Sequence, residues 1–423
     1  MTASAGGLGR VLRLAAARGL NTFGRQILSV AVGWELYERT GSPLTLGLVG
    51  LVQVIPVVAL FVPAGHLVDH RDRRALTSLA ATVTGLAGGG LAVASALHAP
   101  VPSYYALLFV LGCATALHSP AASALVPMII PRDQLARANA IVSSAFELAA
   151  IVGPGLAGLL LWLVAPAWVY GLVAATGLAS GAIYRTLPAP GPVDAGAAPR
   201  TESARRDWRV GLRFIFASDL LLPALTLDLF AVLFAGATAL LPVIARDVLA
   251  VGPAGLGVLR AAPSLGAIVM ALVGARLPAW RRPGHVLLVV VALFGAVTVG
   301  FGLSRWFPLS VALLAVGGAL DNISVVIRIT LEQMVVPDRI RGRVSAVHSV
   351  FIGMSNELGE LESGVAASLF GAVPAIAAGG AVAIAVAGVV ALRWPALRAM
   401  PPLTQLQPAE DLAAATPGPS ARA

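Results

Sequence analysis

The sequence contains no lysine, a single cysteine and few charged residues. Charged residues make up only 12% of its 423 residues, whereas hydrophobic residues make up 58%, and the mean hydropathy is +0.86. So little polar surface cannot cover a water-soluble protein of this length. Because Cys113 stands alone, a disulfide framework and a cysteine-based metal site are excluded. The composition therefore predicts an integral membrane protein.

Apolar stretches long enough to cross a bilayer, which takes about 20 residues, recur along the chain in two groups of six. They are 14–38, 44–66, 75–98, 103–129, 138–164 and 166–187, then 220–244, 253–277, 284–304, 308–333, 344–368 and 370–393. We expect an all-α integral membrane protein with twelve transmembrane helices, six in an N-terminal bundle (1–187) and six in a C-terminal bundle (220–393). Residues 188–219 and 394–423 are polar and proline-bearing, which predicts a cytoplasmic linker and a disordered cytoplasmic tail.

The two groups of segments share one plan. Residues 112–158 align without a gap on residues 318–364, and the ordered matches include Pro131 with Pro337. Matching proline, arginine and glycine residues at several aligned positions, in the same order, are unlikely to occur by chance. We therefore expect the two six-helix bundles to be pseudo-symmetric.

The basic residues, all of them arginine, gather on one side of the expected membrane protein. The loops on one face hold only Arg39, Arg246 and Arg305, while the other face receives the remaining loop and terminal arginines. Because an excess of basic residues marks cytoplasmic loops, we expect an inner-membrane protein with both termini in the cytoplasm. The net charge of +9 then reflects topology and not binding to nucleic acid.

The loop after the second segment reads GHLVDHRDRR over residues 65–74. It resembles the G-x-x-x-D-[RK]-x-G-[RK]-[RK] loop of the major facilitator superfamily, although an aspartate replaces the usual second glycine. The glycine would let helices approach closely, the first aspartate would accept from a neighbouring helix N-terminus, and the arginines would anchor the loop at the phosphate level. A merely topogenic basic loop is the alternative. The residues of this expected gating loop are Gly65, Asp69, Arg71, Asp72, Arg73 and Arg74.

The fifth segment carries IVGPGLAG at residues 151–158, which is similar to the G-P-x-x-G-G element of antiporters in the same superfamily. Gly153 and Gly158 would permit tight helix packing, and Pro154 would favour a kink or pivot. Simple packing without a pivot is the competing interpretation.

Four further stretches, 25–34, 321–328, 337–347 and 355–360, look like the branch of the superfamily that contains enterobactin exporters and macrolide efflux pumps. The resemblance covers nearly the whole chain except the linker and tail. It implies two six-helix bundles around a central cavity, with transport by alternating access. Substrate sites in such transporters lie at the interface of the repeats.

Ionisable residues inside membrane segments are costly and point to function. The candidates for proton coupling are Asp228, Asp321, Glu357 and Glu360, and the first two are favoured. In the gap-free alignment of the two halves, the last three are paired with uncharged residues of the first half. In this hypothesis a buried carboxylate takes up a proton outside and releases it inside. A fixed ion-pair network that only packs the second half is the alternative. The candidates for lining the substrate cavity are Asn21, Arg25, Arg260, Asn322 and Arg328.

The sequence as a whole favours proton-coupled efflux of a small organic molecule, with a siderophore-like compound preferred. The alternatives are a multidrug or macrolide efflux pump, a lysophospholipid flippase and a non-transporting membrane receptor. There is no G-x-x-x-x-G-K-[ST] loop for ATP, and no spacing of residues typical of an enzyme. We expect no cofactor and no metal, and as partners only the bilayer, the substrate and protons. We expect a monomer.

Overall fold

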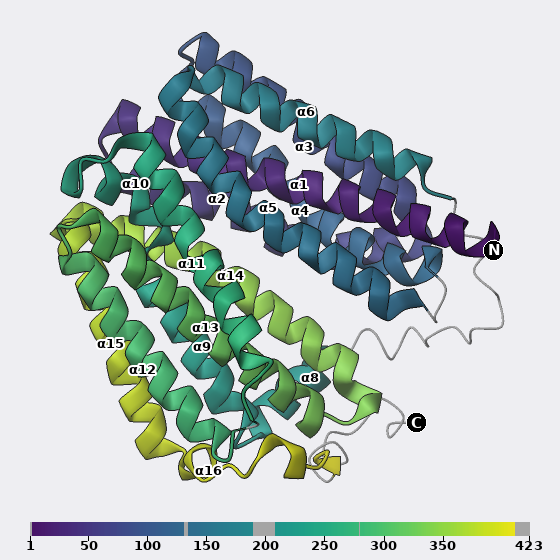
Figure 1. Cartoon of the computed structure of the whole chain (residues 1–423), viewed down its shortest axis with the longest axis vertical. Helices are drawn as coiled ribbons and strands as arrows, with labels where there is room; N and C mark the ends of the chain where they lie inside the picture. The colour runs from purple at the N-terminus through teal and green to yellow at the C-terminus, as the bar shows by residue number, and fades with distance from the viewer. Residues whose placement is uncertain (1, 131–133, 189–207, 279, 411–423) are drawn as a thin grey trace. The chain divides into compact units, whose positions relative to one another are not determined.

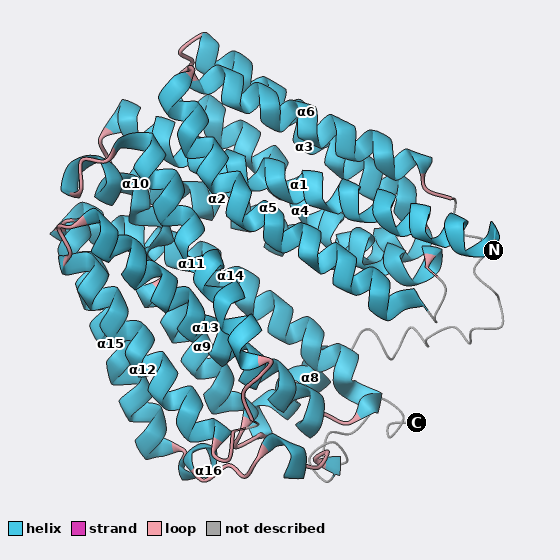
Figure 2. Ribbon diagram, viewed as in Figure 1, coloured by secondary structure: helices cyan, strands magenta, loops and turns pink. Residues whose placement is uncertain are grey.

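The computed structural model describes residues 2–130, 134–188, 208–278 and 280–410. This part of the chain contains helices, turns and loops but no strand (Figure 2). The N-terminal helices are α1 (Thr2–Thr40), α2 (Pro43–His70), α3 (Arg73–Ala96), α4 (Val101–Ile129), α5 (Leu135–Leu163) and α6 (Pro166–Thr186). They are followed by α8 (Trp208–Ala217), α9 (Leu221–Ala235), η2 (Ala237–Leu240), α10 (Leu241–Val243), η3 (Ile244–Val248), α11 (Gly252–Gly274), α12 (Pro283–Leu303), α13 (Phe307–Val335), α14 (Asp338–Phe370), α15 (Ala372–Arg393), α16 (Pro395–Arg398) and η4 (Leu403–Gln405).

The expected all-helical membrane fold is confirmed. Within the described residues, 10 helical segments are long and apolar enough to cross a membrane. The other two expected spans, 14–38 and 344–368, fall on α1 and α14, which are the longest described helices at 39 and 33 residues. Both carry several charged side chains, among them Arg25 and Glu357, which explains why their composition is less apolar. Each of the twelve expected segments thus overlaps a described helix.

The helices group into two compact units. The first unit contains Met1–Asp194 together with Thr238–Ser264, and the second contains Ala195–Ala237 together with Leu265–Ala423. The first unit therefore includes η2, α10, η3 and the first half of α11 as well as the N-terminal helices. These divisions differ from the expected bundle limits, because one stretch of the C-terminal half, Thr238–Ser264, groups with the N-terminal helices.

In the first unit, α3 and α6 lie side by side (Figure 1). Their closest approach is at Gly85 and Gly177, since a Cβ atom on Gly177 would lie 2.6 Å from the Cα atom of Gly85. Only glycine allows backbones this close. Helix α6 is also tied to α1, because the Ser180 hydroxyl donates to the Ala17 carbonyl at 2.8 Å.

The second unit repeats this arrangement with α12 and α15, which lie side by side in the same way (Figure 1). A Cβ atom on Gly295 would lie 2.5 Å from the Gly380 carbonyl oxygen. The core of the second unit also contains the fully buried Phe214 of α8. Helix α8 falls within the expected linker, 188–219, so the end of that stretch is an ordered helix whose apolar face packs against the unit.

The seventh expected span is not one continuous helix. Helix α9 ends at Ala235, and the chain continues past Gly236 through a 3-10 turn, a short α-helical turn and the π turn η3. Irregular backbone at membrane depth is tolerated only where protein or water satisfies its polar groups. Broken helices of this kind occur where transporters bind or gate their substrates.

The expected disordered tail, 394–423, is ordered over its first part. Leu397 and Met400 are 0% and 1% exposed and belong to the core of the second unit, and the Ala409 amide donates to the Val335 carbonyl at 3.0 Å. Burial of these apolar side chains fixes the segment, although its proline content suggested otherwise. The rest of the expected tail, 411–423, and most of the linker, 189–207, lie outside the described residues.

Candidate functional site

The second unit contains a buried ion pair between two candidate residues. The Arg328 guanidinium on α13 contacts the Asp228 carboxylate on α9, and the two residues are 5% and 8% exposed. The Nε atom of Arg328 is also buried, and no described residue hydrogen-bonds to it. Removing one partner of a buried pair typically costs about 3–5 kcal/mol, so this pair contributes to the contact between α9 and α13.

Asp321 lies two helical turns before Arg328 on α13. A separation of seven residues places both on the same face of the helix, and both Arg328 and Asp228 act electrostatically on the Asp321 carboxylate. Unlike Asp228, the Asp321 side chain is exposed. An accessible carboxylate therefore neighbours a buried ion pair, with the half-buried Asn322 next to it.

Glu357 and Glu360 lie half-buried on α14, and each takes part in polar or electrostatic interactions. Gly359, one of the two residues between them, packs on α9: a Cβ atom added there would lie 2.9 Å from the Val232 carbonyl oxygen. Helix α14 thus meets α9 one turn after Asp228. The structure places the two glutamates on a helix that packs against the helix of the ion pair.

A second polar cluster joins α13 and α14. Glu332 accepts hydrogen bonds from the Ser345 hydroxyl and from Nδ1 of His348, the latter at 2.5 Å. Glu332 and His348 are 8% and 7% exposed. Asp321 and Arg328 on α13 were candidates from the sequence, but Glu332 and its partner His348 were not among the predicted site residues. A lone histidine 16 residues away gives no signal until the pairing of the two helices is known.

Asn21 and Arg25 occupy one face of α1 in the first unit. Asn21 is 6% exposed, and its Oδ1 atom has no hydrogen-bond partner in the described part of the chain. Arg25 is exposed and acts electrostatically on His118 of α4, as does Arg18. The stripe Arg18, Asn21 and Arg25 therefore faces α4 and gives the first unit a cationic polar wall.

His118 and Tyr184 complete this wall. Their rings meet edge to face with centroids 5.8 Å apart. The His118 Nε2 atom and the Tyr184 hydroxyl are buried, and neither finds a hydrogen-bond partner within the described segments. Buried polar atoms without partners are costly, so these two atoms are a destabilising feature of the contact between α4 and α6. Tyr184 gave no signal in the sequence.

Arg260 of α11 binds within the first unit. Its guanidinium donates to the Ser29 hydroxyl on α1 and to the Thr238 carbonyl at 3.0 Å. The side chain is half-buried. Arg260 therefore ties α11 to α1 next to the break in the seventh span.

The arginine-poor end of the first unit is closed by contacts between α1 and η3. The Tyr37 hydroxyl donates to the Asp247 carboxylate, and Arg246 donates to the Tyr37 carbonyl at 3.2 Å and to the Glu38 carbonyl at 3.4 Å. The sequence did not reveal these contacts, because they require the irregular turns after α9.

The expected gating loop is only partly described. A Cβ atom on Gly65 would meet no described atom within 4 Å, so the expectation that this glycine allows close helix approach is wrong. The side chain of Asp69 lies outside the described residues, and Arg71 is exposed. Asp72 caps α3, accepting from the amide of Arg74 at 2.8 Å.

The last two arginines of the loop bind the protein itself. Arg73 donates to the Val68 carbonyl at 3.2 Å, and Arg74 donates to the Leu187 carbonyl at 2.9 Å. The aspartate that replaces the usual glycine of this loop therefore has a local role as a helix N-cap. An aspartate directly before the start of a helix is a typical N-cap, so this role of Asp72 could have been predicted from the sequence.

The small residues of α5 lie at two close helix contacts in the first unit. A Cβ atom on Gly153 would lie 2.7 Å from the Gln26 side chain of α1, and one on Gly158 would lie 2.4 Å from the Pro253 carbonyl oxygen and 2.8 Å from Gly257 of α11. Pro154 lies inside α5 between these contacts. The structure shows the tight packing, while a pivoting motion stays a prediction.

A family model described as the Major Facilitator Superfamily matches residues 14–360. The chain belongs to the major facilitator superfamily. It is accordingly a multi-pass membrane protein that transports small molecules as a secondary transporter, and it is not an enzyme.

Individual relatives agree with the family. The chain is 31% identical over 338 residues to the enterobactin exporter EntS of Escherichia coli O6:K15:H31 (strain 536 / UPEC), covering 78% of this chain and 79% of the exporter. Among solved structures, it is similar to a bacterial homolog of the human lysosomal transporter Spinster in an inward-facing and occupied conformation, with a TM-score of 0.71, 15% identity and coverage of 92% and 97%. The nucleoside transporter NupG matches with a TM-score of 0.67 and 14% identity, covering 94% of this chain and 100% of that one. The structural likenesses show the fold alone.

Proposed function

We propose that the protein is a proton-coupled exporter of a siderophore-like compound in the inner membrane, with both termini in the cytoplasm. The similarity to enterobactin exporters supports the cargo class, and the distribution of arginines supports the orientation. The observation that carries the mechanism is the buried pair Asp228–Arg328 beside the exposed carboxylate of Asp321.

Exchange of cargo for protons requires that cargo and proton do not bind to the transporter at the same time. A catechol hydroxyl of the cargo donates a much stronger hydrogen bond to the Asp321 carboxylate when that carboxylate is ionised. Protonation from the outer side weakens the acceptor and releases the cargo, and loss of the proton to the cytoplasm restores the strong acceptor.

The pair Asp228–Arg328 couples the charge state to helix packing. Protonating Asp228 breaks an interaction whose loss typically costs about 3–5 kcal/mol. A proton moved through 100 mV supplies about 2.3 kcal/mol, so a gradient of roughly twice that size is comparable to the cost. The proton gradient is therefore strong enough to switch the contact between α9 and α13.

The cationic wall of the first unit supports an oxygen-rich cargo. Arg18, Arg25, Asn21 and His118 offer donors to carboxylate or phenolate oxygens, and arginine suits such groups particularly well. A cationic drug would meet repulsion at this wall. This charge favours the siderophore-like cargo over the multidrug alternative.

The test is substrate-induced proton movement in proteoliposomes that contain a pH-sensitive dye. Catecholate chelators are compared with cationic amphipathic drugs, using wild type, Asp321→Asn and Asp228→Asn. The matched control is Asp219→Asn, which removes an exposed carboxylate outside the cluster. We expect proton movement with catecholates in wild type and control, and none in the two cluster variants.

Two results would contradict the proposal. Proton movement that both cluster variants retain would assign Asp228 and Asp321 to packing only. Proton movement with cationic drugs alone would identify a multidrug pump instead of a siderophore exporter.

A further inference from the structure

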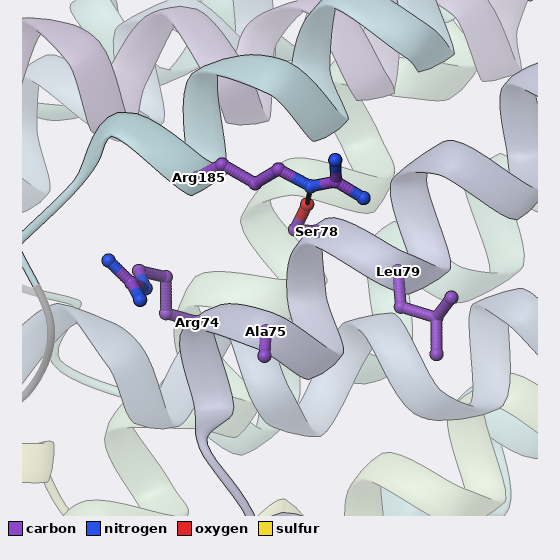
Figure 3. Close-up of a pocket in the computed structure, with 5 residues that line it drawn as sticks. All are labelled: Arg74, Ala75, Ser78, Leu79 and Arg185. Carbon is purple, nitrogen blue, oxygen red and sulfur yellow. Dashed lines mark hydrogen bonds between the residues drawn. The ribbon is translucent and has the colours of Figure 1, made fainter.

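A cavity with no role in the proposed transport cycle lies where α3 and α6 meet in the first unit. It has a volume of about 170 Å³ and is lined by Arg74, Ala75, Ser78, Leu79 and Arg185 (Figure 3). Two of its five lining residues are arginines, from the start of α3 and the end of α6. Both lie at the arginine-rich end of the unit, which we expect to face the cytoplasm.

The two guanidinium groups are held in place by the protein. Arg185 donates through Nε to the Ser78 hydroxyl at 3.2 Å, and that hydroxyl donates to the Gly181 carbonyl at 2.8 Å. Figure 3 shows the two terminal nitrogens of Arg185 beyond this contact, with Arg74 on the other side of Ser78. An arginine has five N–H donors, so Arg185 can hold a ligand oxygen while Nε keeps its position.

Arg74 is similarly fixed by its neighbours. Its NH1 atom donates to the Leu187 carbonyl at 2.9 Å, and NH2 lies 3.7 Å from the Asp72 carboxylate. The aspartate offsets part of the charge of Arg74, but it is itself 40% exposed and caps α3. The cavity therefore keeps an excess of positive charge in a rigid frame.

An apolar stripe leads away from the cavity along α3. Leu79, Leu86 and Val93 are 51%, 63% and 58% exposed. Their spacing of seven residues places them on one face of the helix, and each interval spans about 10 Å. A cationic cavity at the head of an exposed apolar stripe has the shape and chemistry to bind an amphiphile with an anionic head.

We propose that this cavity binds the phosphate of an anionic phospholipid, with an acyl chain along Leu79, Leu86 and Val93. Basic pockets between transmembrane helices on the cytoplasmic side bind anionic headgroups, and arginine recognises phosphate with directed hydrogen bonds. Inorganic phosphate shares the headgroup chemistry but leaves the stripe uncovered. The site does not depend on which cargo is transported.

The experiment measures binding of phosphatidylglycerol to the full chain in a mild detergent, by native mass spectrometry with phosphatidylcholine as the reference lipid. The test variant is Arg74→Gln/Arg185→Gln, and the matched control is Arg276→Gln/Arg281→Gln, which removes two exposed arginines outside the cavity. Since each basic residue near the headgroup contributes roughly fivefold in affinity, we expect about 30-fold weaker binding in the test variant and little change in the control. Equal binding by both variants, or an equal loss in both, would overturn the site.

A second variant tests the acyl-chain contact without touching the arginines. We expect Leu79→Gln to weaken binding of long-chain phosphatidylglycerol but not of a dihexanoyl analogue. Because Leu79 is exposed, this change does not disturb the core. Inorganic phosphate should fail to displace the long-chain lipid at millimolar concentration. Full displacement by phosphate, or an unchanged affinity in Leu79→Gln, would refute a lipid site.

Discussion

The sharpest structural prediction concerns the ion pair Asp228–Arg328. We expect Asp228→Asn to lower the free energy of unfolding by about 3–5 kcal/mol, because it leaves the Arg328 guanidinium buried without a counter-charge. Arg328 is only 5% exposed, so solvent cannot replace the lost partner. Arg328→Gln should cost a similar amount, because it leaves the carboxylate of Asp228 buried instead.

The double variant Asp228→Asn/Arg328→Gln separates a charge interaction from general damage. Two neutral amides can hydrogen-bond to each other, and neutral replacements of buried pairs are often tolerated. We expect the double variant to lie within about 2 kcal/mol of wild type. Against single-variant losses of about 3–5 kcal/mol each, this gives a coupling energy of at least about 4 kcal/mol. The assay is denaturant unfolding in mixed micelles, followed by tryptophan fluorescence.

Two outcomes would refute this reasoning. If the losses of the two single variants simply add in the double variant, the residues do not interact as a pair. If Asp228→Asn costs less than about 1 kcal/mol, the carboxylate is not a buried counter-charge. In either case the pair could not convert protonation into a change of helix packing.

Three further substitutions test other parts of the structure. Gly158→Val should abolish transport while the protein still reaches the membrane, because its Cβ atom would lie 2.4 Å from the Pro253 carbonyl oxygen; normal uptake and efflux in vesicles would contradict this. Asp72→Ala should lower stability by about 1 kcal/mol through loss of the N-cap of α3, measured as the shift in thermal unfolding, whereas Asp72→Asn should keep most of it. Tyr37→Phe should lower the unfolding temperature through loss of the hydrogen bond to a carboxylate, worth about 1.5–3 kcal/mol, and an unchanged temperature would show that the bond contributes nothing.

The helical membrane fold could be predicted because it depends on local composition. A span of about 20 apolar residues has few alternatives to a transmembrane helix, and the internal repeat gave the two-part plan. The break after Ala235 was not predicted, although Gly236 and Pro242 follow it, because glycine and proline are also frequent inside transmembrane helices. The packing of η2, α10, η3 and half of α11 with the first unit is a tertiary property that hydropathy does not encode.

The candidate residues that could be recognised from the sequence are those whose signal is local. Their contacts could not be predicted, because contacts depend on tertiary packing. Arg328 and Asp228 stood out as charges within apolar segments, but their pairing depends on how α13 meets α9. His348 and Tyr184 were missed, since each becomes informative only beside its partner on another helix. Asp72 shows the opposite case: its role as an N-cap is local and was available in the sequence, yet the family resemblance drew attention to the glycine it replaces.

Proton-coupled export predicts that proteoliposomes of the wild-type protein accumulate a catecholate chelator when a proton gradient is imposed. An acid interior is imposed without a membrane potential, and protein-free liposomes control for passive partition. For exchange of one proton for one cargo molecule at zero membrane potential, we predict about tenfold accumulation per pH unit, abolished by a protonophore. Accumulation that ignores the pH gradient, or that persists when the gradient is collapsed, would contradict proton-coupled export.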